Sequence, residues 1–186
     1  MDVAEDADRA AASLAGWLDR LTFADLPTGD VTERIIEAVV AWARGQGWRV
    51  YRRARSVLPL PPPMSRQQSV LDVACARPDG PPVVVEIDHT DRRRTIDKLL
   101  AEAAAGRIPI WVRWGTGGFV APPRPVRMVT CSVTRRTEPV GQGRLYSRNP
   151  TVDLPPPVHS TGDTGDAVVV PLPMPLTDAG PPLPHR

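Results

Sequence analysis

The sequence predicts an α/β protein with a central mixed β-sheet flanked by helices. Two short strands are expected at residues 69–76 and 82–88, and the turn RPDGPP between them predicts an antiparallel hairpin. A helix is expected at residues 92–105, and the apolar run IPIWVRW at residues 108–114 has the composition of a buried strand. Since a helix between two strands is the usual connection of a parallel pair, the sheet should contain both antiparallel and parallel neighbours.

Two helices are predicted before these strands. The first covers residues 4–20, where apolar side chains recur at i, i+3, i+4 and i+7 from Leu14 onward. The second covers residues 31–44. Asp30 and Glu33 have the spacing of a capping box at its start, and glycines follow its end.

Two further strands are predicted at residues 48–57 and 126–133. The first is rich in bulky side chains and arginine. It runs into LPLPPPMSRQQ, which is predicted to be a loop because proline donates no backbone hydrogen bond. The predicted order is therefore helix, helix, three strands, helix and two strands.

The composition divides the chain into three predicted segments. These are an N-terminal helical extension at residues 1–30, an α/β domain at residues 31–136, and a Pro-rich, largely disordered tail at residues 137–186. Residues 150–186 contain ten prolines and three glycines. The piece VVVPLPMPL is more apolar than a linker, so it is a candidate for docking a protein partner.

Charge is distributed unevenly along the chain. The net charge is only +2, but residues 31–136 carry seventeen Arg and one Lys against nine acids, a net charge of +9. The segments on either side are acidic, with net charges of −5 and −2. A basic domain between acidic ends indicates a polyanionic partner such as nucleic acid.

Other features of the sequence bear on location and cofactors. The chain has no run of about 18 apolar residues, which excludes a predicted membrane span. The start MDVAEDADR lacks the layout of a signal peptide, so we expect a cytoplasmic protein without membrane contact. Cys75 and Cys131 lie in apolar runs and are predicted to be buried thiols rather than zinc ligands.

Three acids lie on the predicted hairpin. Asp72 is on its first strand, and Glu86 and Asp88 are on its second strand. Because strand side chains alternate between faces, Glu86 and Asp88 share one face. Pairing through the turn would bring Asp72 beside Glu86. Two converging carboxylates form an oxygen-rich site that suits Mg²⁺ or Mn²⁺ and phosphodiester hydrolysis.

The order of elements from residue 31 to residue 114, with these acids, resembles the PD-(D/E)XK nuclease superfamily. That family has a restriction-endonuclease-like αβββαβ core, with an acid on the core helix, an Asp on the second strand and an acid-x-Lys motif on the third. The resemblance implies that Asp72 and Glu86 bind Mg²⁺ or Mn²⁺ and that the protein hydrolyses DNA. The literal Pro78-Asp79 pair lies in the turn, where both residues have ordinary turn roles.

At two positions the sequence does not match the family pattern directly. The helix acid is Glu33 or Glu37, and Glu37 is preferred because capping already explains Glu33. The lysine position holds Asp88, which cannot supply positive charge but would assist as a further ligand or by positioning water. The charge is then expected from arginines that open the next helix, in particular Arg93, or from Lys98 further along it.

Further arginines are predicted to contact the nucleic-acid backbone without reading its sequence. They are Arg49, Arg52, Arg53, Arg55, Arg66, Arg92 and Arg94. The predicted function is a metal-dependent nuclease acting on DNA, and so compact an enzyme would need a homodimer or a partner to cut both strands. The alternatives are a catalytically degenerate module of the same fold that binds nucleic acid or a protein partner, and an interaction protein that works through its tail.

Overall fold

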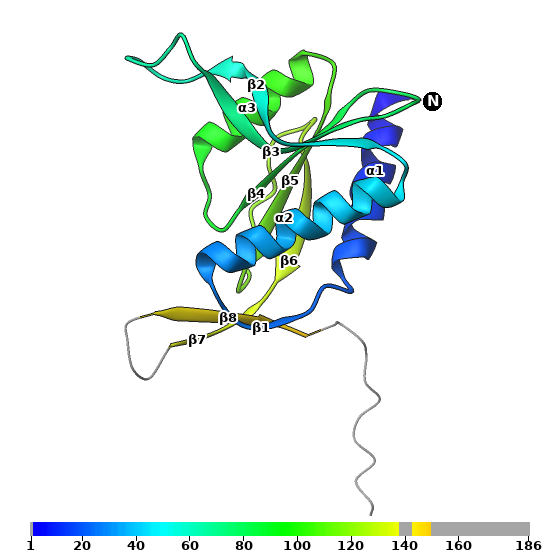
Figure 1. Cartoon of the computed structure of the whole chain (residues 1–186). Helices are drawn as coiled ribbons and strands as arrows, with labels where there is room; N and C mark the ends of the chain where they lie inside the picture. Colours follow the sequence, from blue (N-terminus) through cyan, green and yellow to red (C-terminus); the bar gives the residue numbers. More distant parts are fainter. Residues whose placement is uncertain (1, 138–142, 150–186) are drawn as a thin grey trace, which may run out of the picture. The chain divides into compact units, whose positions relative to one another are not determined.

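A five-stranded mixed β-sheet forms the centre of the fold, and helices cover both of its faces (Figure 1). The protein is described by a computed structural model, which covers residues 2–137 and 143–149. The described elements are α1 (Val3–Leu18), β1 (Phe23–Pro27), α2 (Thr28–Gly45), β2 (Arg49–Pro59), β3 (Gln68–Ala76), β4 (Val83–Asp88), α3 (Arg93–Ala104), β5 (Ile108–Gly115), β6 (Arg127–Ser132), β7 (Thr134–Thr137) and β8 (Arg144–Arg148). The predicted α/β class with a mixed central sheet is confirmed.

The strand order in the central sheet is β2-β3-β4-β5-β6. The predicted hairpin is present, because β3 and β4 pair antiparallel from Cys75–Val83 to Val73–Val85. β4, β5 and β6 are parallel neighbours. α3 makes the crossover from β4 to β5, so both kinds of pairing occur where the sequence predicts them.

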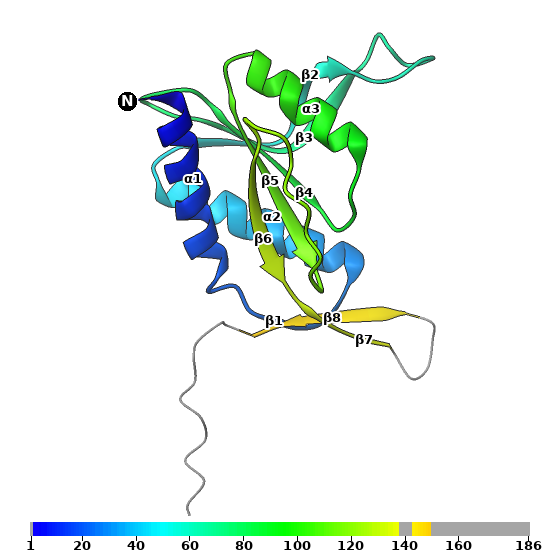
Figure 2. The same cartoon turned by 180° about the vertical axis from the view of Figure 1, so that it is seen from behind.

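The two faces of the sheet bury separate apolar clusters. On one face, Leu14 of α1 and Val39 of α2 pack in one cluster with Val85 of β4. On the other face, Leu99 of α3 packs with Val84. Figures 1 and 2 show α2 and α3 on opposite sides of the sheet. Since side chains alternate along β4, Glu86 lies on the same face as Val84 and therefore faces α3.

A buried carboxylate fixes α3 over the edge strand β2. Glu102 is fully buried and accepts hydrogen bonds from Ser56 Oγ at 2.6 Å and from the Val57 amide at 2.8 Å. It also pairs with Arg107, just after the helix. Lys98 lies one turn before Glu102 on the same helix face, so this anchor also positions Lys98 over the sheet.

A second, three-stranded sheet with the order β1-β8-β7 was not predicted. β8 pairs antiparallel with both β1 and β7, and its Tyr146 is buried in the larger apolar cluster. Folded structure thus continues beyond the predicted tail boundary at residue 137. Residues 150–186, including the candidate docking piece, lie outside the described residues.

The start of α2 also differs from the prediction. The helix begins at Thr28, with Pro27 at the N-cap position and no side-chain cap. The predicted capping box is therefore wrong: Asp30 lies inside the first turn, and Glu33 pairs with Arg52 of β2. Both cysteines are buried, as predicted. In the described part of the chain, no helix has the length and apolar character needed to cross a bilayer.

Candidate active site

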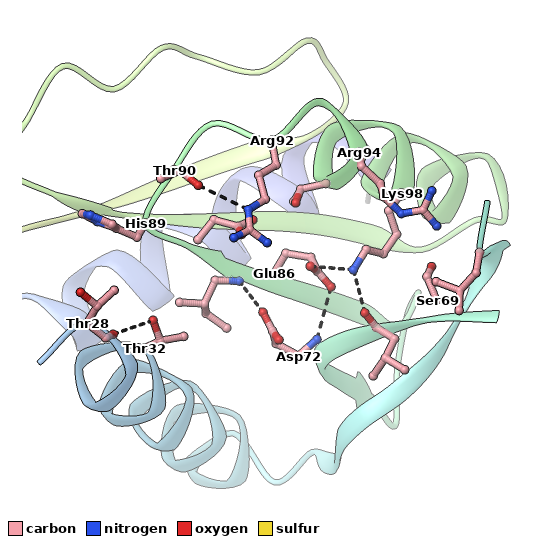
Figure 3. A pocket seen from close by; sticks show the side chains of 15 residues that line it. Thr28, Thr32, Ser69, Asp72, Glu86, His89, Thr90, Arg92, Arg94 and Lys98 are labelled. Atoms are coloured by element: carbon pink, nitrogen blue, oxygen red, sulfur yellow. Dashed lines mark hydrogen bonds and ion pairs between the residues drawn. The ribbon is translucent and has the colours of Figure 1, made fainter. Parts of the chain in front are cut away.

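Asp72 and Glu86 meet where β3 and β4 separate. The regular pairing ends at Val73–Val85. Beyond it, the Ile87 amide donates to Asp72 Oδ2 at 2.8 Å, and the Asp72 amide donates to Glu86 Oε1 at 3.3 Å. Each carboxylate thus accepts from the backbone of the other strand, which holds the two acids side by side as the sequence predicts (Figure 3).

The geometry of β3 changes at Asp72. Leu71 packs in the cluster under α3, whereas Val73 packs in the cluster under α1 and α2. On the neighbouring strand, Arg53 has a φ of 52°, a left-handed conformation that bends a strand. The interruption of strict alternation allows the Asp72 carboxylate to turn toward the β4 backbone.

Lys98 of α3 completes the cluster from the opposite side of the pocket. Its Nζ lies 2.8 Å from Glu86 Oε2 and donates to the Val70 carbonyl at 2.7 Å. Figure 3 shows the lysine reaching from the helix to both partners. Two strands and a helix therefore contribute two carboxylates and one ammonium group to the same point.

Burial and charge make this cluster electrostatically strained. Burial, together with the negative charge of Asp72, raises the pKa of Glu86 from its ordinary value near 4.5 to about 7, although Lys98 acts in the opposite direction. Burial also raises the pKa of Asp72, despite the hydrogen bond from Ile87. Additional positive charge would favour the ionised form of both carboxylates.

The cluster lies in a pocket of about 550 Å³. The wall on the α2 side is formed by Thr28 and Thr32, and His89 follows β4 into the same pocket. Arg92 and Arg94 line the α3 side (Figure 3). Arg92 Nε donates to Thr90 Oγ1 at 3.4 Å, and Arg94 donates to the Pro59 carbonyl at 3.0 Å. Both arginines thus add positive charge to the pocket that contains Asp72 and Glu86.

Asp88 also lines this pocket, but its contact lies elsewhere. Its Oδ2 accepts from Trp111 Nε1 at 3.0 Å. That hydrogen bond holds the carboxylate against β5, and the charge of Asp88 contributes to the raised pKa of both Asp72 and Glu86.

Two predicted catalytic residues are not brought to this pocket. Glu37 lies on α2 in a separate surface groove with Trp17 and pairs with Arg34 at 3.5 Å. Arg93 lines another pocket, beside Trp111. The place expected for Arg93 is taken by Lys98, because Arg94 and Lys98 share one helix face and Arg93 lies on the adjacent one.

The other predicted nucleic-acid contacts lie mainly on or near the sheet edge. Arg49, Arg53 and Arg55 are exposed on β2, and Arg66 is exposed in the loop between β2 and β3. Arg52 on the same strand pairs with Glu33. The edge strand β2 therefore presents several exposed guanidinium groups.

Asp72 and Glu86 are the carboxylates of this pocket that lie side by side. In residues 2–137 and 143–149, no group of three or more His, Cys, Asp or Glu side chains is arranged to hold a metal ion. Asp72 and Glu86 alone would then be the protein ligands. Mg²⁺ is commonly held by one or two carboxylates together with water and substrate phosphate, so two carboxylates are sufficient for it.

Sequence reasoning missed several residues of the pocket. Thr28 and Thr32 are one turn apart on α2, and Trp114 Nε1 donates to Thr32 Oγ1 at 3.2 Å. His89 stacks on Trp114, with ring centroids 4.2 Å apart. The position of His89 directly after the acids of β4 was the available signal for its place in the pocket.

No protein-family model, curated protein sequence or solved structure matches this chain.

Proposed function

We propose that this protein is a metal-dependent nuclease that hydrolyses phosphodiester bonds in DNA. The observation that carries the proposal is the convergence of Asp72, Glu86 and Lys98, from three elements, in one arginine-rimmed pocket. Such a set combines oxygen ligands for a cation with a positive charge close to them, and both are needed to handle a phosphate.

The element order supports a restriction-endonuclease-like core as part of this proposal. α2, β2, β3, β4, α3 and β5 follow in the order expected for that core, and the acids lie on its second and third strands. Asp88 replaces the lysine of the acid-x-Lys motif. In our proposal Lys98 supplies the missing positive charge from α3, since its Nζ lies 2.8 Å from Glu86.

Each residue has a distinct part in the proposed reaction. A divalent cation held by Asp72 and Glu86 would activate a water nucleophile and neutralise charge on the phosphate. Arg92 would bind a phosphate oxygen at the mouth of the pocket. Lys98 would stabilise the charge that develops at phosphorus, and Asp88, held by Trp111, would orient water.

A second candidate is a catalytically degenerate module that binds nucleic acid. One observation favours it: the charge of Lys98 is already paired with Glu86, and both acids accept backbone hydrogen bonds. The same cluster could therefore have a structural role and hold β3, β4 and α3 together. Such a module would keep the basic edge of β2 but would bind no divalent cation.

Calorimetric titration with Mn²⁺ or Mg²⁺ separates the two functions, with plasmid cleavage followed on the same samples. The nuclease should bind the ion, and Asp72→Asn and Glu86→Gln should each lose both binding and cleavage. Glu37→Gln is the matched control, because Glu37 is an acid outside the pocket, and it should keep both. If the wild-type protein binds no metal even with DNA present, the nuclease proposal fails and the binding module stands.

A further inference from the structure

Arg113 of β5 is a buried cation with few partners. Its side chain is 5% exposed, and Nη2 contacts Asp91 Oδ1 at 2.9 Å. Its guanidinium carbon lies 4.7 Å from the centre of the Trp111 ring. Its Nε and Nη1 are buried without a hydrogen-bond partner. Elsewhere in the described part of the chain, buried Arg77 and Arg148 each leave only Nε unpaired.

This arrangement is energetically unfavourable for an isolated protein. A buried charged group with unpaired donors loses its hydration without replacement, and a water, an ion or a ligand can supply the missing acceptors. Asp91, the ionic partner of Arg113 among the described residues, is 57% exposed. A group with several acceptor oxygens would satisfy Arg113 better than this carboxylate.

The neighbours of Arg113 line a second pocket, of about 540 Å³. Its wall includes Arg92, Arg93, Asp91 and Asp97, together with Trp111. Arg113 does not line this pocket itself but contacts two residues of its wall, Asp91 and Trp111. Arg113 lies at the carboxyl end of the parallel strands β4 and β5, where ligands commonly bind in α/β sheets.

The second pocket adjoins the candidate active site. Arg92 lines both pockets. Trp111, in the wall of the second pocket, donates to Asp88, in the wall of the first. Asp88 and Arg113 are also direct neighbours in the β4–β5 register. A chain of phosphates that filled the first pocket could therefore continue past Arg92 into the second.

We propose that Arg113, with Arg92 and Arg93, binds a phosphate group of the nucleic acid next to the one that is cleaved, and that Asp91 occupies this position in the free protein. The identity of the ligand rests on the proposed nuclease function. In the free protein the carboxylate of Asp91 pairs with Arg113, and the incoming phosphate displaces it. This assigns a positioning role to Arg93, which lies outside the pocket of the acids.

Inorganic phosphate is the probe, titrated by calorimetry without metal and at constant ionic strength. Asp91→Asn should bind phosphate about threefold to fivefold more tightly than the wild type, the size expected when one partly exposed ion pair no longer competes. Arg113→Gln should cancel that gain in the Asp91→Asn background. Thermal unfolding followed by circular dichroism checks that each variant is folded.

Asp8→Asn is the matched control. Asp8 is 60% exposed and pairs with Arg127, which is 11% exposed, so the pair resembles Asp91–Arg113. However, Arg127 also donates to the carbonyls of Pro125 and Ala4, so no unpaired site is released. Asp8→Asn should leave phosphate affinity unchanged.

Equal phosphate affinity of Asp91→Asn and Asp8→Asn would overturn the inference, even if Arg113→Gln fails to fold. The phosphate titration contains no metal ion and no DNA. Its result therefore does not depend on whether the protein is a nuclease. Phosphate binding at Arg113 without any nuclease activity would overturn the proposed function alone. If the wild type cleaves DNA but Asp91→Asn leaves the phosphate affinity unchanged, this subsite alone is overturned.

Discussion

Replacement of Lys98 by methionine should destabilise the protein in a pH-dependent way. The side chain keeps its length and apolar stem but loses the ammonium that contacts Glu86 at 2.8 Å and the Val70 carbonyl at 2.7 Å. At about pH 9 the variant would bury an ionised Glu86 beside Asp72 without a cation. Breaking a buried pair in this way costs about 3–5 kcal/mol of the free energy of unfolding.

The pH dependence follows from the pKa of Glu86, which is about 7 in the folded protein and near 4.5 when unperturbed. Between these values the folded chain binds more protons than the unfolded chain. The stability contributed by Glu86 is therefore complete below about pH 4.5 and is lost as the pH rises through about 7. In the wild type, the shift of the Glu86 pKa corresponds to a loss of about 3 kcal/mol in the free energy of unfolding as the pH rises from below 4.5 to above 7.

Loss of Lys98 raises the pKa of Glu86 further, because the lysine lowers it. The deficit of Lys98→Met should thus be largest near pH 9 and smaller near pH 5, where Glu86 is protonated in both proteins. At pH 5 the lost hydrogen bond to Val70 still costs about 1 kcal/mol.

Urea denaturation at about pH 5, 7 and 9, followed by circular dichroism, measures this deficit directly. Glu86→Gln in the Lys98→Met background should remove most of its pH dependence, because no titrating group is left at that position. Glu33→Gln, which breaks an exposed pair with Arg52, is the control and should cost less than about 1 kcal/mol at every pH. A Lys98→Met deficit that is the same at all three pH values would refute the reasoning.

Three further predictions follow from the same structure. Metal binding near pH 7 should release protons, because Glu86 is partly protonated there. Calorimetry in buffers of different ionisation enthalpy would detect this release, and binding heats that do not depend on the buffer would contradict it. Glu102→Gln should lower the free energy of unfolding by about 1.5–3 kcal/mol, measured by urea denaturation, because a charged acceptor of the Ser56 hydroxyl and the Val57 amide is lost. The buried thiols of Cys75 and Cys131 should react with a thiol reagent only as fast as the chain unfolds, because burial raises the pKa of both, to about 12 for Cys75; fast labelling of the folded protein would argue against it.

The acid hairpin was predictable because its determinants are local. A short turn fixes the pairing of two strands, and the register Val73–Val85 then places Asp72 opposite Glu86. The crossover helix and the buried strand after it were predictable for the same reason, since length, apolar spacing and a following glycine indicate them without reference to distant residues.

Helix rotation explains the residues that the sequence placed wrongly. On α2, Thr28 and Thr32 face the pocket, and Glu37 is rotated away from them. On α3, Lys98 faces the pocket and Arg93 does not. One residue turns a helix by about 100°, so an uncertainty of one position in the helix face exchanges a site residue for a surface residue.

The small sheet could not be predicted because its first strand, β1, pairs with a strand far away in the sequence. β1 finds its partner in β8, about 120 residues later, and neither strand has a strong alternating pattern. This pairing also explains the failed capping box, since β1 runs directly into α2 and moves its start to Thr28. Long-range pairing decided the local structure there.

The central claim is that Asp72, Glu86 and Lys98 act together in DNA cleavage. The most direct test compares supercoiled plasmid cleavage, with Mn²⁺ or Mg²⁺, by the wild type, Lys98→Met and Arg93→Gln. The account predicts metal-dependent cleavage by the wild type, a loss of at least about 100-fold in rate for Lys98→Met under conditions where it is folded, and a loss of less than about 10-fold for Arg93→Gln. Absence of cleavage by the wild type, or a Lys98→Met variant as active as the wild type, would contradict it.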